Sequence, residues 1–524
     1  MHIVLQTEEL RAMIFDELKT PDLGALATTC KELLEPVLRV LWAECSDFTY
    51  VVRLLPESAW SYRWNLGNRK EIYISRHLEE RDIARIRYYA SFIRRFDLIP
   101  HPGLRPYTPS SLADILDALR GEVLFPNLRD LGFYSPSTYL PSLLRLVSSS
   151  VIKLSICLLP EAGNTGTADD MPSTQPLLPS LETILSAIKE RHSHHITTLH
   201  IWSAAADVWI ADVLSGWDTL QDVQIRYHCN ADMLLAVLAL PRLRSLVIDG
   251  CSSSPMVVTL NQEFDTPLLR SMDLRCLSHI TSATNVIASL RNAELVKIHA
   301  QANADRESLQ NFFHALPNCC SPRSLRSLLV TSPYDGTTQV PLSLALMRPL
   351  LAFVELTNLV LAMPSEYVSN DDIRQLACAL PRLEKLSLVA QMFTQSATPK
   401  ITLSGLVWLA RYCHRLQTLN LSIDATNTLL PEGMPADCTQ NSLINLGVSN
   451  SPISSHIAVA SFLSRFFPFL HDVFPRDKLG DRTSEWWRVG HAIPLFVEAR
   501  DSGFQGQFHG VRPPPSLSMY DFFA

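Results

Sequence analysis

Apolar residues recur along most of this chain in one phrase, in which an apolar position is followed three and five residues later by two more. The last two positions flank a polar one, which predicts a short strand that buries one face. The segment 239–243 reads Ala-Leu-Pro-Arg-Leu and returns unchanged at 379–383. Strand centres are predicted at Leu131, Leu199, Val223, Leu246, Met272, Leu328, Leu359, Leu386, Leu419 and Leu446, with weaker copies around Phe96, Leu154 and Ile298.

Helical stretches separate these strands, for example at 111–120, 231–240, 371–380 and 403–412. A proline commonly precedes the strand and prevents the helix from continuing. Helix and strand repeated in one direction predict an α/β fold of parallel strands joined by right-handed helical crossovers. No single unit covers its own apolar face, whereas stacked neighbours do.

This pattern resembles a leucine-rich-repeat solenoid over about residues 65–450. The asparagine or cysteine that this family places three positions after the last leucine is matched only by Cys251. The resemblance therefore implies an irregular solenoid with outer helices that lacks the usual side-chain ladder. A doubly wound α/β sheet is the alternative architecture.

The first 45 residues carry a different pattern, which predicts three short helices. Leu10, Ile14, Phe15 and Leu18 recur at three- and four-residue spacing after Thr7, a suitable cap. A second helix is expected to be capped by Asp22 after a break at Pro21, and to carry Leu23 and Leu26. A third is expected to open at Pro36 and to carry Leu41 and Trp42.

The order Glu9-Leu10, Ile14-Phe15, Leu18, Pro21-Asp22-Leu23, Cys30-Lys31 and Leu41-Trp42 resembles an F-box over about residues 5–45. Where the motif usually opens with Leu-Pro, this sequence has Gln6-Thr7. The resemblance implies docking to the Skp-type adaptor of a cullin ubiquitin ligase, through Leu10, Ile14, Phe15, Leu18, Leu23, Leu26, Leu41 and Trp42. The alternative is a helical cap on the end of the solenoid.

Composition and pattern together suggest five parts. Residues 1–50 form the F-box-like module, 51–105 a helical linker with first repeats, and 106–450 the solenoid with a loop insertion at 159–179. Residues 451–502 are expected to cap the last repeat, and 503–524 to form a flexible tail. The ending resembles that of basidiomycete-type F-box proteins. The basic residues between 51 and 105 are interpreted as a solvated helical face, with a phosphate or acidic-peptide site as the alternative.

Bulk properties narrow the possible partners. A net charge of −7 over 524 residues gives no case for nucleic acid. Glu8, Glu9 and Arg11 interrupt any signal peptide, and no apolar run approaches the roughly 20 residues of a membrane span. The 11 cysteines lack paired spacing. Reduced thiols in a cytoplasmic or nuclear protein are therefore expected.

The sequence contains none of the common catalytic or ligand-binding motifs. The chain has no nucleophile elbow, phosphate loop, dinucleotide fingerprint or metal-protease motif. The histidines at 192, 194 and 195 lack a nearby cysteine or carboxylate to complete a ligand set. The sequence therefore predicts no catalytic residue, no metal and no cofactor.

Binding is a better-supported hypothesis, because strand residues that flank the buried pairs face the concave surface of such a solenoid. Trp202 stands out as an indole on a polar surface. The candidate target-binding residues are His200, Trp202, Gln224, Arg226, Asp249, Asp273, Arg275, Lys385 and Asn420. The leading hypothesis is a ligase substrate receptor with an unidentified target protein. A repeat scaffold without a ligase role and an enzyme in a doubly wound sheet are the alternatives.

Overall fold

The computed structural model describes residues 7–64, 70–98, 109–159, 180–203, 210–226, 230–250, 258, 260, 262–331, 340–365, 367–389, 398–429, 438–449, 451–474 and 485–502. Within these ranges the chain divides into two compact units. Unit 1 comprises Met1–Val340 with Leu346–Glu355, and unit 2 comprises Pro341–Ala345 with Leu356–Ala524. Gln6, Cys251, the tail and nearly all of the 159–179 insertion lie outside the described residues.

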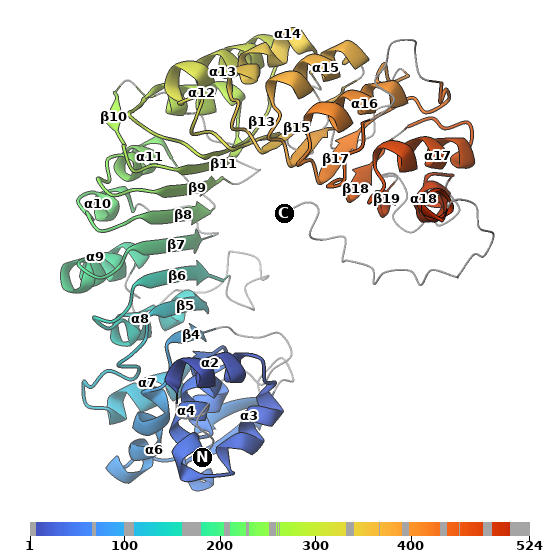
Figure 1. Ribbon diagram of the computed structural model, residues 1–524. Helices are drawn as coiled ribbons and strands as arrows, with labels where there is room; N and C mark the ends of the chain where they lie inside the picture. The colour runs from blue at the N-terminus through green and yellow to red at the C-terminus, as the bar shows by residue number, and fades with distance from the viewer. Residues whose placement is uncertain are drawn as a thin grey trace. The chain divides into compact units, whose positions relative to one another are not determined.

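Unit 1 contains parallel strands that pair in chain order (Figure 1). The strands are β1 (Glu44–Cys45), β4 (Arg95–Leu98), β5 (Asp130–Ser135), β6 (Lys153–Leu158), β7 (Thr198–Ser203), β8 (Asp222–Arg226), β9 (Ser245–Asp249), β11 (Ser271–Leu277), β13 (Lys297–Ala302) and β14 (Ser327–Thr331). Two minor sheets accompany them: antiparallel β2 (Trp60–Trp64) with β3 (Lys70–Ile74), and parallel β10 (Phe264–Asp265) with β12 (Leu290–Arg291).

The helices that connect the parallel strands of unit 1 lie on one side of its sheet, and we call the other side the open face (Figure 1). The connecting helices are α5 (Phe48–Val52), α6 (Glu80–Ala90), α7 (Pro109–Ala118), α8 (Leu140–Leu146), α9 (Leu181–His192), α10 (Ala211–Leu214), α11 (Ala231–Leu238), α12 (Ile280–Ala288) and α13 (Arg306–Cys319). Three further helices, α2 (Glu8–Asp16), α3 (Thr20–Ala27) and α4 (Lys31–Leu41), precede β1. Short 3-10 turns are η1 (Glu57–Ala59), η2 (Ser137–Tyr139) and η3 (Arg348–Ala352).

Unit 2 repeats the same design. Its parallel strands are β15 (Asn358–Ala362), β16 (Lys385–Leu388), β17 (Thr418–Leu421), β18 (Asn445–Gly447) and β19 (Asp472–Phe474). Its helices are α15 (Asn370–Ala379), α16 (Leu403–Tyr412), α17 (His456–Phe466) and α18 (Glu485–Asp501), and α14 (Leu344–Met347) lies at the division between the units. All ten predicted strand centres and the three weaker copies fall within observed strands, so the leucine-rich-repeat-like α/β fold is confirmed.

The core of each unit is built from rows of apolar side chains in register. In unit 1, Leu131 is the register partner of Leu154, which in turn pairs with Leu199. All three are completely buried beneath the connecting helices. Such rows bury a continuous apolar layer that no repeat encloses alone. In the part of the chain that the structure describes, no helix has the length and apolar character needed to cross a membrane.

Main-chain hydrogen bonds link each repeat to the next at the amino ends of the strands. The carbonyl of Arg129 accepts from the amides of Ile152 (2.8 Å) and Lys153 (2.9 Å). The carbonyl of Ile152 then accepts from Thr197 (2.9 Å) and Thr198 (3.2 Å). The same bifurcated pattern continues through Gln221, Arg244 and beyond in unit 1, and through Glu384 and Gln417 in unit 2. We call this series the carbonyl ladder.

The N-terminal helices form as predicted, but their capping differs. Thr7 occupies the position before α2, yet its side chain makes no capping hydrogen bond. The second helix begins at Thr20, with Pro21 in its first turn and Lys19 at the cap position, so the predicted Asp22 cap is wrong. The third begins at Lys31, leaving Pro36 inside it. The first helix begins directly after Thr7, as expected, whereas the second and third begin earlier than expected. In the second, Pro21 and Asp22 are both tolerated in the first turn.

The basic stretch after this module is not wholly helical. Arg63 lies on β2, in an antiparallel hairpin, and its guanidinium carbon is 5.6 Å from the centre of the Tyr73 ring. The alternation of aromatic and polar residues from Trp60 to Trp64 has the period of a strand. The interpretation of a continuous helical face therefore fails at this hairpin.

Gly132 on β5 is required by its neighbours, and we predict that Gly132→Ala destabilises unit 1 by roughly 1–3 kcal/mol. A Cβ there would overlap Oδ1 of Asp97 and lie 2.6 Å from Cε2 of Tyr134. Chemical denaturation would measure the loss. Gly24→Ala in α3 is the matched control, because nothing lies within 4 Å of its Cβ position and alanine favours helix. Equal stability of the two variants would contradict the prediction.

Candidate functional site

The three N-terminal helices enclose a small apolar core of their own. Phe15, Leu23, Leu33 and Val37 are buried in it, and Leu18, Leu26, Ala27, Val40 and Leu41 pack against it. Five of the predicted adaptor-binding residues, Phe15, Leu18, Leu23, Leu26 and Leu41, therefore belong to the internal packing of the module. The apolar spacing of these residues is therefore explained by packing inside the module as well as by contact with a partner.

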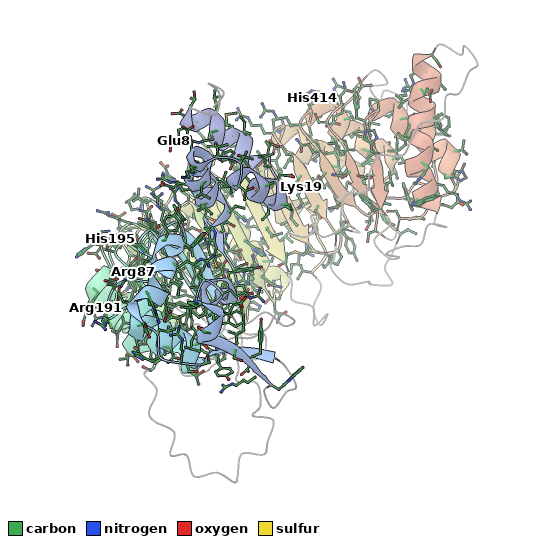
Figure 2. The ribbon with its side chains drawn as sticks, turned by 90° about the horizontal axis from the view of Figure 1, so that it is seen from below. Glu8, Lys19, Arg87, Arg191, His195 and His414 are labelled. Carbon is green, nitrogen blue, oxygen red and sulfur yellow. The ribbon has the colours of Figure 1, made fainter. Side chains whose placement is uncertain are left out.

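One face of α2 remains uncovered. Leu10 is 43% exposed, Met13 66% and Ile14 37%, and we call these three side chains the α2 patch. Figure 2 labels Glu8 and Lys19 on the same helical module. Leu34 on α4 is also exposed. The sequence reasoning missed Met13, although its spacing of three residues from Leu10 was a usable signal.

Trp42 follows α4 and contacts the solenoid. Its ring centroid lies 4.9 Å from that of Tyr89 on α6. Strand β1 then pairs with β4 in parallel, with Glu44 opposite Arg95. Thus the module continues directly into the sheet of unit 1, and Trp42 spans the join.

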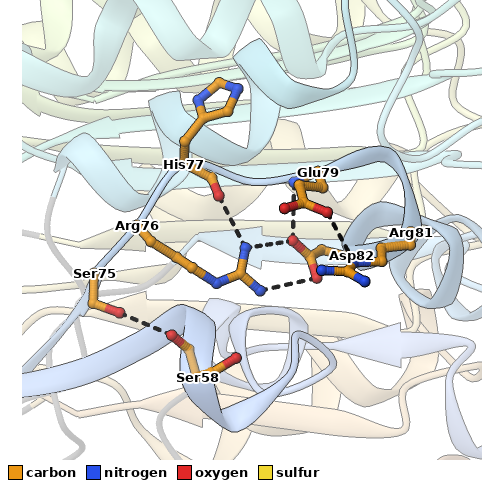
Figure 3. Close-up of polar contacts among 7 residues, drawn as sticks. All are labelled: Ser58, Ser75, Arg76, His77, Glu79, Arg81 and Asp82. Carbon is orange, nitrogen blue, oxygen red and sulfur yellow. Dashed lines mark hydrogen bonds and ion pairs between the residues drawn. The ribbon is translucent and has the colours of Figure 1, made fainter.

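Helix α6 is fixed at its start by a charged network (Figure 3). Nη1 and Nη2 of Arg76 donate to the carboxylate of Asp82 at 2.7 and 3.1 Å. The Glu79 amide donates to the same carboxylate at 2.9 Å, and Arg76 also donates to the carbonyl of His77 at 2.9 Å. Asp82 is buried. The Arg76 hydrogen bonds, followed by that of the Glu79 amide, lower the pKa of Asp82 to about 2.

This network predicts an acid-dependent loss of stability. A carboxyl whose pKa falls from about 3.9 in the unfolded chain to about 2 stabilises the fold above pH 4. That contribution disappears as the pH falls from 4 towards 2. We therefore expect Asp82→Asn to lower the thermal midpoint at pH 7, and the difference from wild type to shrink below pH 4. Circular dichroism melts between pH 2 and 7 would measure both.

Asp232→Asn is the matched control for this experiment. Asp232 also lies in the first turn of a helix, α11, but its side chain is exposed. Its replacement should leave the melting curves close to wild type at every pH. A pH-independent difference between Asp82→Asn and wild type would contradict the assigned role of the carboxylate.

An aromatic–arginine cluster occupies the open face over strands β5 to β8. The rings of Tyr134 and Trp202 are 5.5 Å apart, and the Arg226 guanidinium carbon is 5.1 Å from the centre of the Trp202 ring. With its side-chain amide oriented so that the oxygen faces the guanidinium, Gln224 accepts from Nε and Nη2 of Arg226 at 2.7 and 2.9 Å. Asp249 lies 3.8 Å from Nε of the same arginine. The guanidinium is thus held in place before any partner arrives, which reduces the entropy lost on binding.

A second charged group lies further along the open face. Asp273, only 5% exposed, accepts from Arg275 at 2.9 and 2.7 Å and lies 2.8 Å from Nδ1 of His299. Burial by itself would raise the pKa of Asp273, but the hydrogen bonds from His299 and Arg275 bring it to about 2. The sequence reasoning missed His299. Its signal is the register between β11 and β13, which pairs it with Asp273.

Of the remaining candidates, His200 adjoins the aromatic–arginine cluster as the register partner of Gln224, whereas Lys385 and Asn420 belong to unit 2. His200 Nδ1 is 3.4 Å from Ser155 Oγ, and burial lowers its pKa. In unit 2, Lys385 begins β16, and Asn420 on β17 lies against the Cα of Gly447. Within the described ranges, no group of three histidine, cysteine or acidic side chains is arranged to hold a metal ion.

The fold and these surfaces define a class of protein, a leucine-rich-repeat-like solenoid preceded by a small helical module. No family model matches the sequence, and no curated protein matches it. Among solved structures, the chain is similar to one described as the crystal structure of the Rad7 and Elc1 complex in yeast. The likeness has 14% identity and a TM-score of 0.37, and covers 72% of this chain and 87% of that chain. A TM-score this low gives no guidance on function.

Proposed function

We propose that this chain is the substrate-recognition subunit of a Skp-cullin-F-box ubiquitin ligase. In this proposal α2 to α4 dock a Skp-type adaptor and the solenoid holds a target protein. The observation that carries it is the α2 patch, because a module with a complete core of its own still exposes Leu10, Met13 and Ile14. The F-box-like order of residues in the same helices indicates that the partner of the patch is a Skp-type adaptor.

The size of the patch is consistent with a moderate interface. Burial of a large apolar side chain contributes about 1.5–3 kcal/mol before the costs of association. Three such side chains, already partly covered, contribute less than their full value. Leu34 on α4 provides a further exposed apolar side chain within the module. A stable complex therefore requires contacts from more than α2.

The target side of the proposal rests on the aromatic–arginine cluster. Tryptophan, tyrosine and arginine are the residues that most often dominate protein–protein binding energy. Here Tyr134, Trp202 and Arg226 contact one another on the open face. A target held on this face needs no covalent step from the chain itself. Its role is to raise the local concentration of target lysines near the charged conjugating enzyme.

A second candidate function is a repeat scaffold whose N-terminal helices serve only as a solenoid cap. The contact between Trp42 and Tyr89 and the pairing of β1 with β4 favour it, since both join the module to the repeats. The two candidates differ in what they require of the α2 patch. A cap needs no partner there, whereas a receptor does.

Direct binding separates the candidates. The purified full-length chain should bind a purified Skp-type adaptor with micromolar or tighter affinity by isothermal titration calorimetry, and should recruit a cullin through it. No binding at micromolar concentration would refute the receptor role and leave the scaffold.

A further inference from the structure

Four cations on the open face of unit 1 are neutralised within the molecule. Each has a carboxylate within ion-pair distance: Arg95 with Asp97 (3.2 Å), Lys153 with Asp130 (3.2 Å), Arg226 with Asp249 (3.8 Å) and Arg275 with Asp273 (2.7 Å). Pairing of this kind reduces the cost of removing a charge from water. These cations therefore have little remaining electrostatic attraction for an anion from another molecule.

Lys385 in unit 2 differs from all of them. It begins β16 one position before the buried Leu386, so its side chain lies on the face of the unit 2 sheet opposite that of Leu386, which we call the open face of unit 2. It is only partly exposed. Among the residues that the structure describes, no carboxylate forms an ion pair with it. Its neighbours in register are Asn358 and Thr418, followed by Asn445. Burial lowers the pKa of its ammonium group.

Among the described residues of this row in unit 2, Asp472 alone is acidic, and it is too far away to form an ion pair with Lys385. Asp472 on β19 is three strands from Lys385, which is roughly 14 Å at a spacing of about 4.8 Å per strand. The row therefore presents one positive charge among neutral amide and hydroxyl groups. Such groups offer hydrogen bonds to an anion without competing for the ammonium.

We propose that the open face of unit 2 binds an acidic segment of the target protein, with one aspartate or glutamate carboxylate on Lys385. This rests on the proposed function, which gives the solenoid a protein target. A single lysine matches the single charge of a carboxylate, whereas a phosphate carries nearly two and is usually met by more than one cation. Ser387 and Asn420 in the adjoining row provide polar contacts for the segment's main chain.

The test uses fluorescein-labelled deca-glutamate as the probe and fluorescence anisotropy of the full-length chain. Wild type should bind it despite a net charge of −7, which disfavours non-specific attraction of an acidic peptide. Lys385→Met should weaken binding roughly tenfold or more, since a charge-assisted hydrogen bond is lost. Lys385→Arg should retain most of the affinity.

Lys400→Met is the matched control within unit 2. Lys400 is exposed, lies outside the strands, and its ammonium is 5.3 Å from the centre of the Tyr367 ring. This variant has the same net charge as Lys385→Met and should bind deca-glutamate like wild type. Thermal melts should show Lys385→Met at least as stable as wild type, because an uncompensated charge has been removed.

Three outcomes would overturn the inference: unchanged binding by Lys385→Met, equal binding of deca-glutamine, or tighter binding of a phosphoserine peptide of the same length. The adaptor assay on the same variant keeps the two proposals apart. If the wild-type chain does not bind the adaptor, the receptor role is refuted. If Lys385→Met binds deca-glutamate as tightly as wild type does, only the acidic-segment site is refuted.

Discussion

Met13→Asp combined with Ile14→Asp is expected to abolish capture of a Skp-type adaptor while both units remain folded. Both side chains are exposed, so the substitutions cost the free protein little. In the complex the two carboxylates would enter a dry apolar interface, which costs several kcal/mol without a partner. The expected change in dissociation constant is about 100-fold or more. Isothermal titration with purified adaptor would measure it.

Ile457→Asp provides the control for a new surface charge on an exposed apolar helix position. Ile457 lies on α17 and is 52% exposed, an exposure similar to those of the α2 patch. Its replacement should leave adaptor affinity unchanged. If the Met13/Ile14 double variant bound the adaptor as tightly as wild type, the α2 patch would not be the docking surface.

Gln440→Leu is expected to lower the free energy of unfolding of unit 2 on the order of 3 kcal/mol. Gln440 is 1% exposed and connects two successive turns through both ends of its amide. Nε2 donates to the carbonyl of Leu416 at 2.7 Å, and Oε1 accepts from the amide of Leu443 at 2.8 Å. Leucine would leave both main-chain groups buried without these partners. Denaturation in urea would measure the loss.

The exposed Gln375 gives the comparison for this experiment. Its amide bonds only to Asp371 on the same helix, at 3.0 Å. Gln375→Leu should therefore change stability by no more than about 0.5 kcal/mol. Equal stability of the two leucine variants would mean that the carbonyl ladder alone holds the turn around Gln440.

Strand positions could be predicted from the sequence because a strand with one buried face has a period of two, and that period is written in residues such as Leu131 and Leu419. Helix starts were less predictable. Thr7 is a good cap by residue type, but its side chain makes no capping bond. The hairpin at 60–74 carried a period-two signal that its many basic residues obscured.

The candidate surfaces were predictable only in part. The F-box-like order predicted Leu10 and Ile14 as docking residues, and both are exposed on α2, but their role in docking stays a prediction. The contact of Asp97 with Gly132, and that of Asp273 with His299, depend on register between strands 26 or more residues apart. One sequence does not give that register. For the same reason it could not show that Lys385 has no carboxylate in ion-pair contact among the described residues.

The carbonyl ladder has a consequence for how this chain tolerates change. In many repeat proteins, adjacent repeats are linked through the side chain of one particular residue, so a substitution at that position weakens the contact between the repeats. Here the join uses the carbonyl of Arg129 and the amides of Ile152 and Lys153, which every residue except proline supplies. The side chains at these positions are therefore free to diversify while the spacing of the repeats stays fixed. The repeat fold can therefore be retained in a sequence that lacks the conserved asparagine or cysteine by which such repeats are usually recognised.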